Sequence, residues 1–415
     1  MCTLPIAISL SPNCQKKDAW RAFFLLLQPW RWQNGEMITQ IEQWFKHNYP
    51  TQEAVSFNSG RSALYAILKS FAIGEGDEVL IQAFTCVAVP NSIIWSGAKP
   101  VYADIDNTFN LDTKAIEKYI SSKTKAIIIQ HTFGIPAQIE KLKQIAEKYG
   151  LILIEDCAHS LDITYGNKKL GTFADASFFS FGRDKVISSV FGGMAIINSK
   201  FKIQNSKLRE FQKKSLFPNH FWIFQQLMHP IAFSIILPVY NFFSLGKIIL
   251  RLLQFLHLLS FPVYQEEKIG RQPNIFPAKL PNALAALAFI QLERLSEFNK
   301  RRKEIAEFYI KHLKNLPFCL STRQKLAYLR YPILAKQASQ LKEFAKSKRI
   351  ILGDWYSNII DPKDVSLDKL GYIKGSCPNA ERIASQIINL PTYQRMTIED
   401  ARRIVKIIHE FYRSK

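Results

Sequence analysis

Residues 151–194 read LILIEDCAHSLDITYGNKKLGTFADASFFSFGRDKVISSVFGGM. The apolar run 151–154 has the length of a strand and stops at the carboxylates of residues 155–156. A second apolar run, 176–179, ends in Ser180, and a pair of glycines leads into a third run at 194–197. Strands of a parallel sheet are apolar throughout, and ligands bind at their carboxyl ends. The stretch therefore predicts buried strands with a functional site where they end.

A carboxylate and a lysine follow two of these strands. Asp156 and Lys185 are 29 residues apart in the chain (185 − 156). Pyridoxal phosphate needs an amine for a Schiff base and a carboxylate that keeps its ring nitrogen protonated. The pair suits such a site. The alternative is that Lys185 is one solvated lysine among 55 Lys and Arg residues.

The rest of the large domain alternates between strands and helices. Strands are predicted at 78–82, 101–104 and 126–130, and helices at 61–71, 87–96, 113–120 and 139–149. Short connections in this alternation are typical of a parallel sheet flanked by helices.

Several motifs resemble one known family. EDCAHS (155–160), SFGRDK (180–185) and the following GG resemble the core of the DegT/DnrJ/EryC1/StrS family, the sugar aminotransferases among fold-type I pyridoxal phosphate enzymes. FNSGRSAL (57–64) and the helical segment 291–313 extend the resemblance to most of the chain, roughly residues 200–265 excepted.

The resemblance implies an α/β fold of type I in a homodimer. It implies a large pyridoxal-phosphate-binding domain at 1–214, with a mainly parallel sheet flanked by helices, and a smaller C-terminal α+β domain at 266–415. Residues 215–265 are then a hydrophobic insertion that ordinary members of the family lack.

The resemblance also implies three catalytic residues. Lys185 matches the Schiff-base lysine, Asp156 the partner of the ring nitrogen, and His159 the residue that hydrogen-bonds the phenolic oxygen. A buried structural histidine is the alternative for His159. His131, in a segment that resembles the family's HLYG element, is as often structural as catalytic.

Ser59, Gly60, Arg61 and Ser180 match residues that hold the cofactor phosphate. Residues 59–60 precede a predicted helix, whose first N–H groups and positive dipole end bind anions. Arg61 stands where the family has threonine, so only its backbone role carries over, and Ser62 is the alternative source of a hydroxyl.

Other positions depart from the family. Cys86 stands where an aromatic residue stacks on the cofactor ring, so stacking is expected from elsewhere, with Phe84 a candidate; a structural cysteine is the alternative. The usual Gly-Glu-Gly-Gly is reduced to residues 191–193, FGG. Pro277 and Lys279 replace the asparagine and arginine that reach the neighbouring subunit's site. Lys279 can still meet a phosphate as a point charge.

The implied reaction moves an amino group, from glutamate, to a keto-sugar carried on a nucleotide. One alternative is a pyridoxamine-dependent sugar dehydratase, which Lys185 argues against because that branch has histidine there. The other is a pyridoxal-binding sensor or membrane-associated scaffold without turnover.

Composition limits the partners. The 415 residues carry a formal net charge of +21, but the basic residues are scattered along predicted helices rather than interleaved with aromatics, so no nucleic acid partner is expected. Six cysteines without metal-ligand spacing fit a reducing cytoplasm and no metal site. Of these, Cys2 and Cys319 lie outside the residues that the structure describes.

Residues 215–246 contain no Asp, Glu, Lys or Arg. Polar residues and prolines interrupt the apolar run, so two or three interfacial helices are expected rather than a spanning helix. Residues 215–262 then make a peripheral contact with a membrane, with Lys247 and Arg251 at the polar edge. The alternative is packing within the enzyme or its dimer. The tryptophans at 20, 30, 32 and 44 are expected to serve packing.

Overall fold

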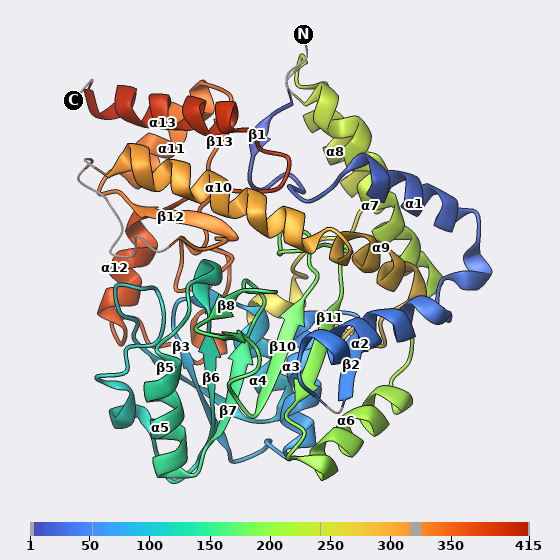
Figure 1. Ribbon diagram of the computed structural model, residues 1–415, viewed down its shortest axis with the longest axis vertical. Coiled ribbons are helices and arrows are strands. Elements are labelled where there is room, and N and C mark those ends of the chain that lie inside the picture. Colours follow the sequence, from blue (N-terminus) through green and yellow to red (C-terminus); the bar gives the residue numbers. More distant parts are fainter. Residues whose placement is uncertain (1–3, 52, 241, 315, 317–324, 414–415) are drawn as a thin grey trace.

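The computed structural model describes residues 4–51, 53–240, 242–314, 316 and 325–413. Its centre is a seven-stranded sheet in the order β2-β11-β10-β7-β6-β3-β5 (Figure 1). The strand β11 runs in the opposite direction to all the other strands of this sheet, which are parallel to one another. The predicted mainly parallel α/β sheet is confirmed. The strands are β2 (Glu53–Phe57), β3 (Glu78–Gln82), β5 (Lys99–Ala103), β6 (Thr124–Gln130), β7 (Ile152–Asp156), β10 (Ala176–Ser180) and β11 (Gly193–Ile197).

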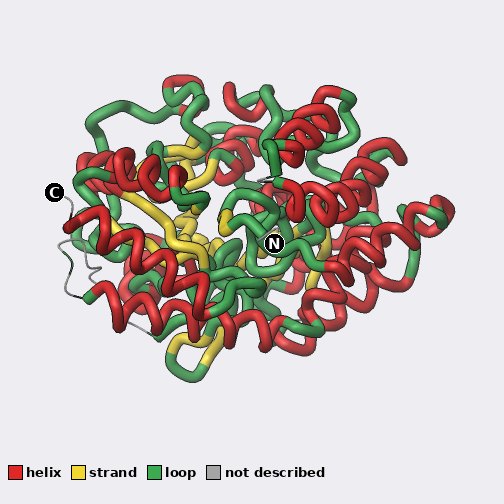
Figure 2. Tube along the Cα trace, turned by 90° about the horizontal axis from the view of Figure 1, so that it is seen from above, coloured by secondary structure: helices red, strands yellow, loops and turns green. Residues whose placement is uncertain are grey.

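Both faces of the sheet are buried, which is why its strands are apolar throughout. Val79 and Ile81 of β3 belong to one apolar core and Leu80 between them to another. The first core contains α3 (Gly60–Ser70), α4 (Ala88–Ser96) and Leu208 of α6 (Lys202–Lys214). The second contains α2 (Glu36–Asn48), α5 (Ile139–Tyr149) and α9 (Asn282–Leu292). Figure 2 shows helices on both sides of the strands.

The C-terminal part covers one end of the sheet, and in Figure 1 its long helix α10 (Leu295–Leu313) lies between α11 (Ala338–Ser347) and α13 (Ile398–Arg413) on one side and β12 (Arg330–Leu334) on the other. The partition at residues 214 and 265 stays a prediction, and two strand pairs cross it: β1 (Ile6–Ala7) with β13 (Ile350–Ile351), and β4 (Thr85–Cys86) with β14 (Ile360–Asp361). The other elements of this part are α12 (Pro378–Gln386) and β15 (Ile387–Pro391).

The hydrophobic insertion forms two helices, α7 (His220–Val239) and α8 (Leu245–Phe255). The helix α7 continues through Pro230 and Pro238. It packs between α8 and α1 (Lys16–Leu26). Within the described residues, α7 is the one helix long and apolar enough to cross a membrane, yet 56% of that apolar window is buried in the protein, as in a core helix.

The predicted helix at 113–120 is wrong. Asp112 accepts hydrogen bonds from the backbone of Lys114 and Ala115, which closes a separate turn. Only the 3₁₀ helix η2 (Ile116–Tyr119) follows it. The remaining short elements are η1 (Pro29–Arg31), η3 (Thr132–Gly134), β8 (Thr164–Tyr165), β9 (Lys168–Lys169), η4 (Glu266–Ile269) and η5 (Asp368–Leu370).

Candidate active site

A cavity of about 370 Å³ lies where β7 and β10 end and α3 begins. The C-terminal part and the end of the insertion complete its walls. The lining includes Ser59, Gly60, Arg61, Cys86, Asp156, His159, Ser180, Arg183, Lys185, Phe261, Pro262, Val263, Trp355, Tyr356 and Asp361. All the site residues predicted from the sequence line this cavity except Lys279.

Lys185 lies in the loop after β10. Its Nζ is 3.0 Å from Nε2 of His159 and 4.8 Å from the centre of the Trp355 ring. Burial lowers the pKa of Lys185, and nearby Cys86 and Asp156 oppose this shift. An amine with a lowered pKa is more often unprotonated, so it is a better nucleophile.

His159 is held between stacked rings. The centre of the imidazole lies 5.5 Å from the centre of the Trp355 ring and 6.0 Å from the centre of the Phe133 ring, and both rings are nearly parallel to it. The backbone N–H of Phe133 donates to Nδ1 at 3.1 Å, and the Tyr356 hydroxyl is 3.2 Å from Nε2. Burial, and then the cations Lys185 and Arg330, hold the pKa of His159 well below its usual range. The ring is therefore neutral, and because Nδ1 accepts, the proton is on Nε2.

Asp156 ends β7 and is buried. One oxygen of its carboxylate accepts the backbone N–H of Ala158 at 2.9 Å. Burial raises the pKa of Asp156, while this hydrogen bond and Lys185 lower it. The other oxygen can face a cationic group in the cavity.

The start of α3 forms a cradle for an anion. Ser59 caps the helix by accepting the Ser62 N–H at 3.2 Å. A Cβ on Gly60 would come within 2.9 Å of the Ser180 Cβ, and one on Gly193 within 2.5 Å of the Gly60 backbone nitrogen. Only glycine fits these approaches, which leave the first N–H groups of α3 open beside the Ser180 hydroxyl.

The Arg61 side chain turns away from this cradle. It pairs with Glu267, donates to the Pro262 carbonyl at 3.0 Å and lies 4.7 Å from the centre of the Phe276 ring. Its guanidinium therefore anchors the segment after the insertion. The Ser62 hydroxyl donates to Asn58 at 2.7 Å, outside the cavity lining, so it is not a replacement for the missing threonine hydroxyl.

Cys86 lines the cavity, and burial raises the pKa of its thiol, which stays protonated. Phe84 is fully buried against Tyr356 and Phe133 and lies outside the lining. The Lys279 amine lies 5.3 Å from the centre of the Phe217 ring, away from the cavity of its own chain.

His131 is a structural residue. Its Nε2 lies 3.0 Å from Glu155, and its Nδ1 accepts the backbone N–H of Ala137 at 3.2 Å. Glu155 also accepts the backbone N–H groups of Gly171, Phe173 and Ala174. The pair braces the loop between β9 and β10.

Sequence reasoning missed Trp355, Tyr356 and Asp361. They come from the segment around β14, and pairing of β14 with β4 brings Asp361 beside Cys86. Burial, and then repulsion from Asp354, raises the pKa of Asp361 to about 7. The adjacent Trp and Tyr near Asp-Pro were the only signal in the sequence, and they match no catalytic motif.

The donor set fits pyridoxal phosphate. A buried amine with a lowered pKa, a buried carboxylate, a histidine N–H and a helix N-terminus surround one cavity of suitable size. Lys185, Asp156 and His159 could hold the aldehyde, the ring nitrogen and the phenolic oxygen. The start of α3 and Ser180 could hold the phosphate.

Comparison with known proteins gives full-length matches. The model of the DegT/DnrJ/EryC1/StrS aminotransferase family matches residues 13–221 and 255–409. The GDP-perosamine synthase of Escherichia coli O157:H7 is 28% identical over 93% of each chain. The dTDP-3-amino-3,6-dideoxy-alpha-D-galactopyranose transaminase of Aneurinibacillus thermoaerophilus is 25% identical over 91% of this chain and 90% of its own.

Solved structures share the fold. Helicobacter pylori PseC, an aminotransferase involved in the biosynthesis of pseudoaminic acid, superposes with a TM-score of 0.75 at 22% identity over 97% of this chain and 98% of its own. DesI, solved in the presence of its TDP-sugar product, has a TM-score of 0.73 at 20% identity over 98% and 93%. The family match skips residues 222–254, which hold most of α7 and α8.

Proposed function

We propose, because this chain belongs to the DegT/DnrJ/EryC1/StrS aminotransferase family, that it transfers an amino group from glutamate to a keto-sugar carried on a nucleotide. The family is pyridoxal-phosphate-dependent. The observation that carries the proposal is the Lys185 amine, 3.0 Å from a neutral His159 in a cavity that also holds a buried carboxylate. The names of two relatives, which refer to GDP- and dTDP-linked amino sugars, support the substrate class.

Each residue has a role toward the cofactor. Pyridoxal phosphate, when bound, supplies an electron sink for the bond that breaks at the amino-bearing carbon. Lys185 would hold its aldehyde, and Asp156 would stabilise a protonated ring nitrogen. The Nε2–H of His159 would donate to the phenolic oxygen, because its Nδ1 is already occupied by the Phe133 N–H.

The phosphate would lie at the start of α3. The Gly60 and Arg61 backbones, Ser59 and Ser180 would hold it there, with the dipole of α3 adding attraction. The Arg61 guanidinium is already paired with Glu267, so it would add only long-range positive charge.

Lys185 would also move the proton of the reaction. Its Nζ, whose pKa is lowered by burial, would take a proton from the α carbon of the amino donor. It would then deliver this proton to the cofactor carbon that carried the aldehyde. The stacked rings around His159 exclude water from this side of the amine.

The test is the absorbance of the bound cofactor. Lys185→Ala should lose the visible band of the protein-linked cofactor and release the cofactor on desalting, whereas Lys168→Ala, an exposed lysine, should keep both. An unchanged spectrum in Lys185→Ala would remove the assignment of this lysine.

Excess glutamate then separates an aminotransferase from a scaffold without turnover. An aminotransferase converts its bound cofactor to the pyridoxamine form, and the visible band disappears. A band that persists with glutamate and every other amino donor would favour the scaffold. A panel of nucleotide-linked keto-sugars, added to the pyridoxamine form, would identify the substrate by return of the band.

A further inference from the structure

The helix α8 carries an exposed apolar stripe. Leu245, Ile248, Leu252 and Phe255 recur at intervals of three or four residues, so they lie on one face, and all four are exposed. Phe255 is 79% exposed. The opposite side of α8 packs on α7 through Ile249, Leu250 and Leu253. A helix that is apolar on two sides has a second partner besides the protein core.

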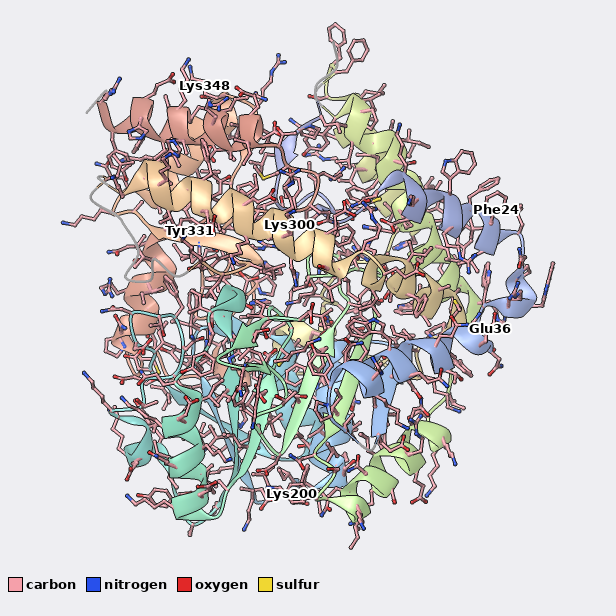
Figure 3. All side chains as sticks on the ribbon, in the orientation of Figure 1. Phe24, Glu36, Lys200, Lys300, Tyr331 and Lys348 are labelled. Atoms are coloured by element: carbon pink, nitrogen blue, oxygen red, sulfur yellow. The ribbon has the colours of Figure 1, made fainter. Side chains whose placement is uncertain are left out.

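The helix α1 carries a second stripe. Trp20, Phe23, Phe24 and Leu27 share one helical face and are exposed, and Trp20 is 63% exposed. Figure 3 shows Phe24 at the outer edge of the molecule. The prediction that the N-terminal tryptophans serve packing is therefore correct for the buried Trp32 and for Trp44, which packs against the core, and wrong for the exposed Trp20 and Trp30. The inner face of α1 uses other residues.

Both helices pack on α7 and lie on one side of the molecule, away from α12 (Figure 1). Phe242 and Phe243, in the turn between α7 and α8, add exposed rings, and Phe243 is 88% exposed. We call the exposed residues of α1, of α8 and of this turn the docking face. Exposed apolar side chains that gather on one side of a protein mark an interaction site.

The exposed charges on α1 and on α8 are all positive. Lys247 and Arg251 flank the stripe of α8, and Lys16 and Arg21 lie on the exposed side of α1. Residues 211–265 contain no Asp or Glu. The carboxylate of α1, Asp18, is buried and accepts a hydrogen bond from Gln291 at 2.9 Å.

We propose that the docking face binds the surface of a membrane that contains anionic lipid. Aromatic and aliphatic side chains would enter the interface while the adjacent basic residues meet the headgroups. A second copy of the chain fits less well, because an isologous contact would bring two faces of the same positive charge together. The inference goes beyond the transamination proposed above and is independent of it.

The test is binding of the full chain to vesicles of phosphatidylcholine and phosphatidylglycerol in equal parts, with pure phosphatidylcholine for comparison. We expect the protein to float with the anionic vesicles and to bind less at high salt. Ile248→Ser/Leu252→Ser/Phe255→Ser should lower the partition coefficient about 100-fold. Lys247→Gln/Arg251→Gln should lower it about 30-fold.

Matched controls replace exposed residues elsewhere. Ile203→Ser/Ile373→Ser and Lys141→Gln/Lys311→Gln should bind as the parent does. Circular dichroism and the cofactor band in solution show whether each variant folds and binds the cofactor, and loss of the band with glutamate tests the proposed reaction separately. The inference is overturned if the parent stays unbound at low salt. It is also overturned if the apolar variant loses self-association while vesicle binding is unchanged, since the face is then a contact between copies.

Discussion

At the scale of single residues, the site depends on the tautomer of His159. A backbone N–H occupies Nδ1, so the neutral ring presents its proton at Nε2, toward Lys185 and the Tyr356 hydroxyl. A protonated ring beside Lys185 would put two cations 3.0 Å apart in a buried place. Trp355 and Phe133, which stack on His159, help to bury the imidazole, so they keep it neutral and fix its orientation.

This geometry predicts different outcomes for two substitutions of His159. Glutamine retains a side-chain N–H, so His159→Gln should keep most of the cofactor affinity. His159→Leu should weaken it about tenfold to a hundredfold, because the phenolic oxygen loses a charge-assisted hydrogen bond. Fluorescence titration of the cofactor-free protein measures this, with the exposed His47→Leu as control. Equal losses in both His159 variants would contradict the donor role.

Asp361 predicts a pH dependence of stability. Burial raises its pKa to about 7 in the folded protein, above the usual value of about 3.9 in an unfolded chain. The unfolded chain therefore releases this proton first, and the fold loses stability as pH rises from about 4 to about 7. Asp361→Asn should remove that loss, which is at most about 4 kcal/mol.

Urea unfolding of parent and Asp361→Asn at pH values below and above this window measures the effect. Relative to the parent, Asp361→Asn should gain more free energy of unfolding above this pH window than below it. At still higher pH the gain should not change further. A gain that is the same at both pH values would show that the carboxyl does not titrate as proposed.

At the scale of elements, the insertion is joined to the active site at its base. Arg183, in the lysine loop, donates to the Ser260 hydroxyl at 2.5 Å, and Ser260 donates to Gln226 of α7 at 2.7 Å. Phe261 and Val263 continue from there into the cavity wall. Of the two sequence alternatives, internal packing describes α7, whereas the outer side of α8 stays exposed and its contact with a membrane stays a proposal.

The close packing around Gly246 leads to a prediction about how α8 is held against α7. A Cβ there would lie 2.5 Å from the Tyr240 Cα and 2.6 Å from the Ile236 carbonyl oxygen. Gly246→Ala should push α8 away from α7, at a cost of about 1–3 kcal/mol. Hydrogen exchange of the α8 amides reports this opening directly. Lys247→Ala, the exposed neighbour, should change stability by less than about 0.5 kcal/mol. Unchanged exchange in Gly246→Ala would mean that α8 is not packed as described.

At the scale of the whole molecule, the position of Lys279 favours a homodimer. Its amine does not reach the cavity of its own chain, although its place in the sequence matches a residue that family members direct into the neighbouring site. We therefore expect a homodimer in sedimentation at working concentration, with Lys279 near the partner's phosphate site.

Mixed dimers test this arrangement. A dimer of one Lys185→Ala and one Lys279→Ala subunit has one site with both defects and one intact site if Lys279 acts across the interface. The purified mixed dimer should then have up to about half of the parent's activity, because one of its two sites is intact. If Lys279 acts in its own chain, both sites keep one defect and no activity returns. A fully active monomer would also contradict the prediction.

The sequence by itself determined the sheet and the main reactive residues. Runs such as 151–154 and 176–179 are apolar because both faces of a parallel sheet are covered, and this requirement is local to each strand. Asp156 ends one such strand and Lys185 lies in the short loop after another, so the two residues meet at one sheet edge.

Only the tertiary structure decided what surrounds that edge. Trp355 and Tyr356 reach the cavity through pairing of β14 with β4, a contact between distant segments that no local period encodes. The Arg61 side chain turns to Glu267 for the same reason. The period of α1 predicts one apolar face, but whether that face is buried depends on the neighbour, and here α1 turns its aromatic residues outward because α7 and α9 pack against its other side.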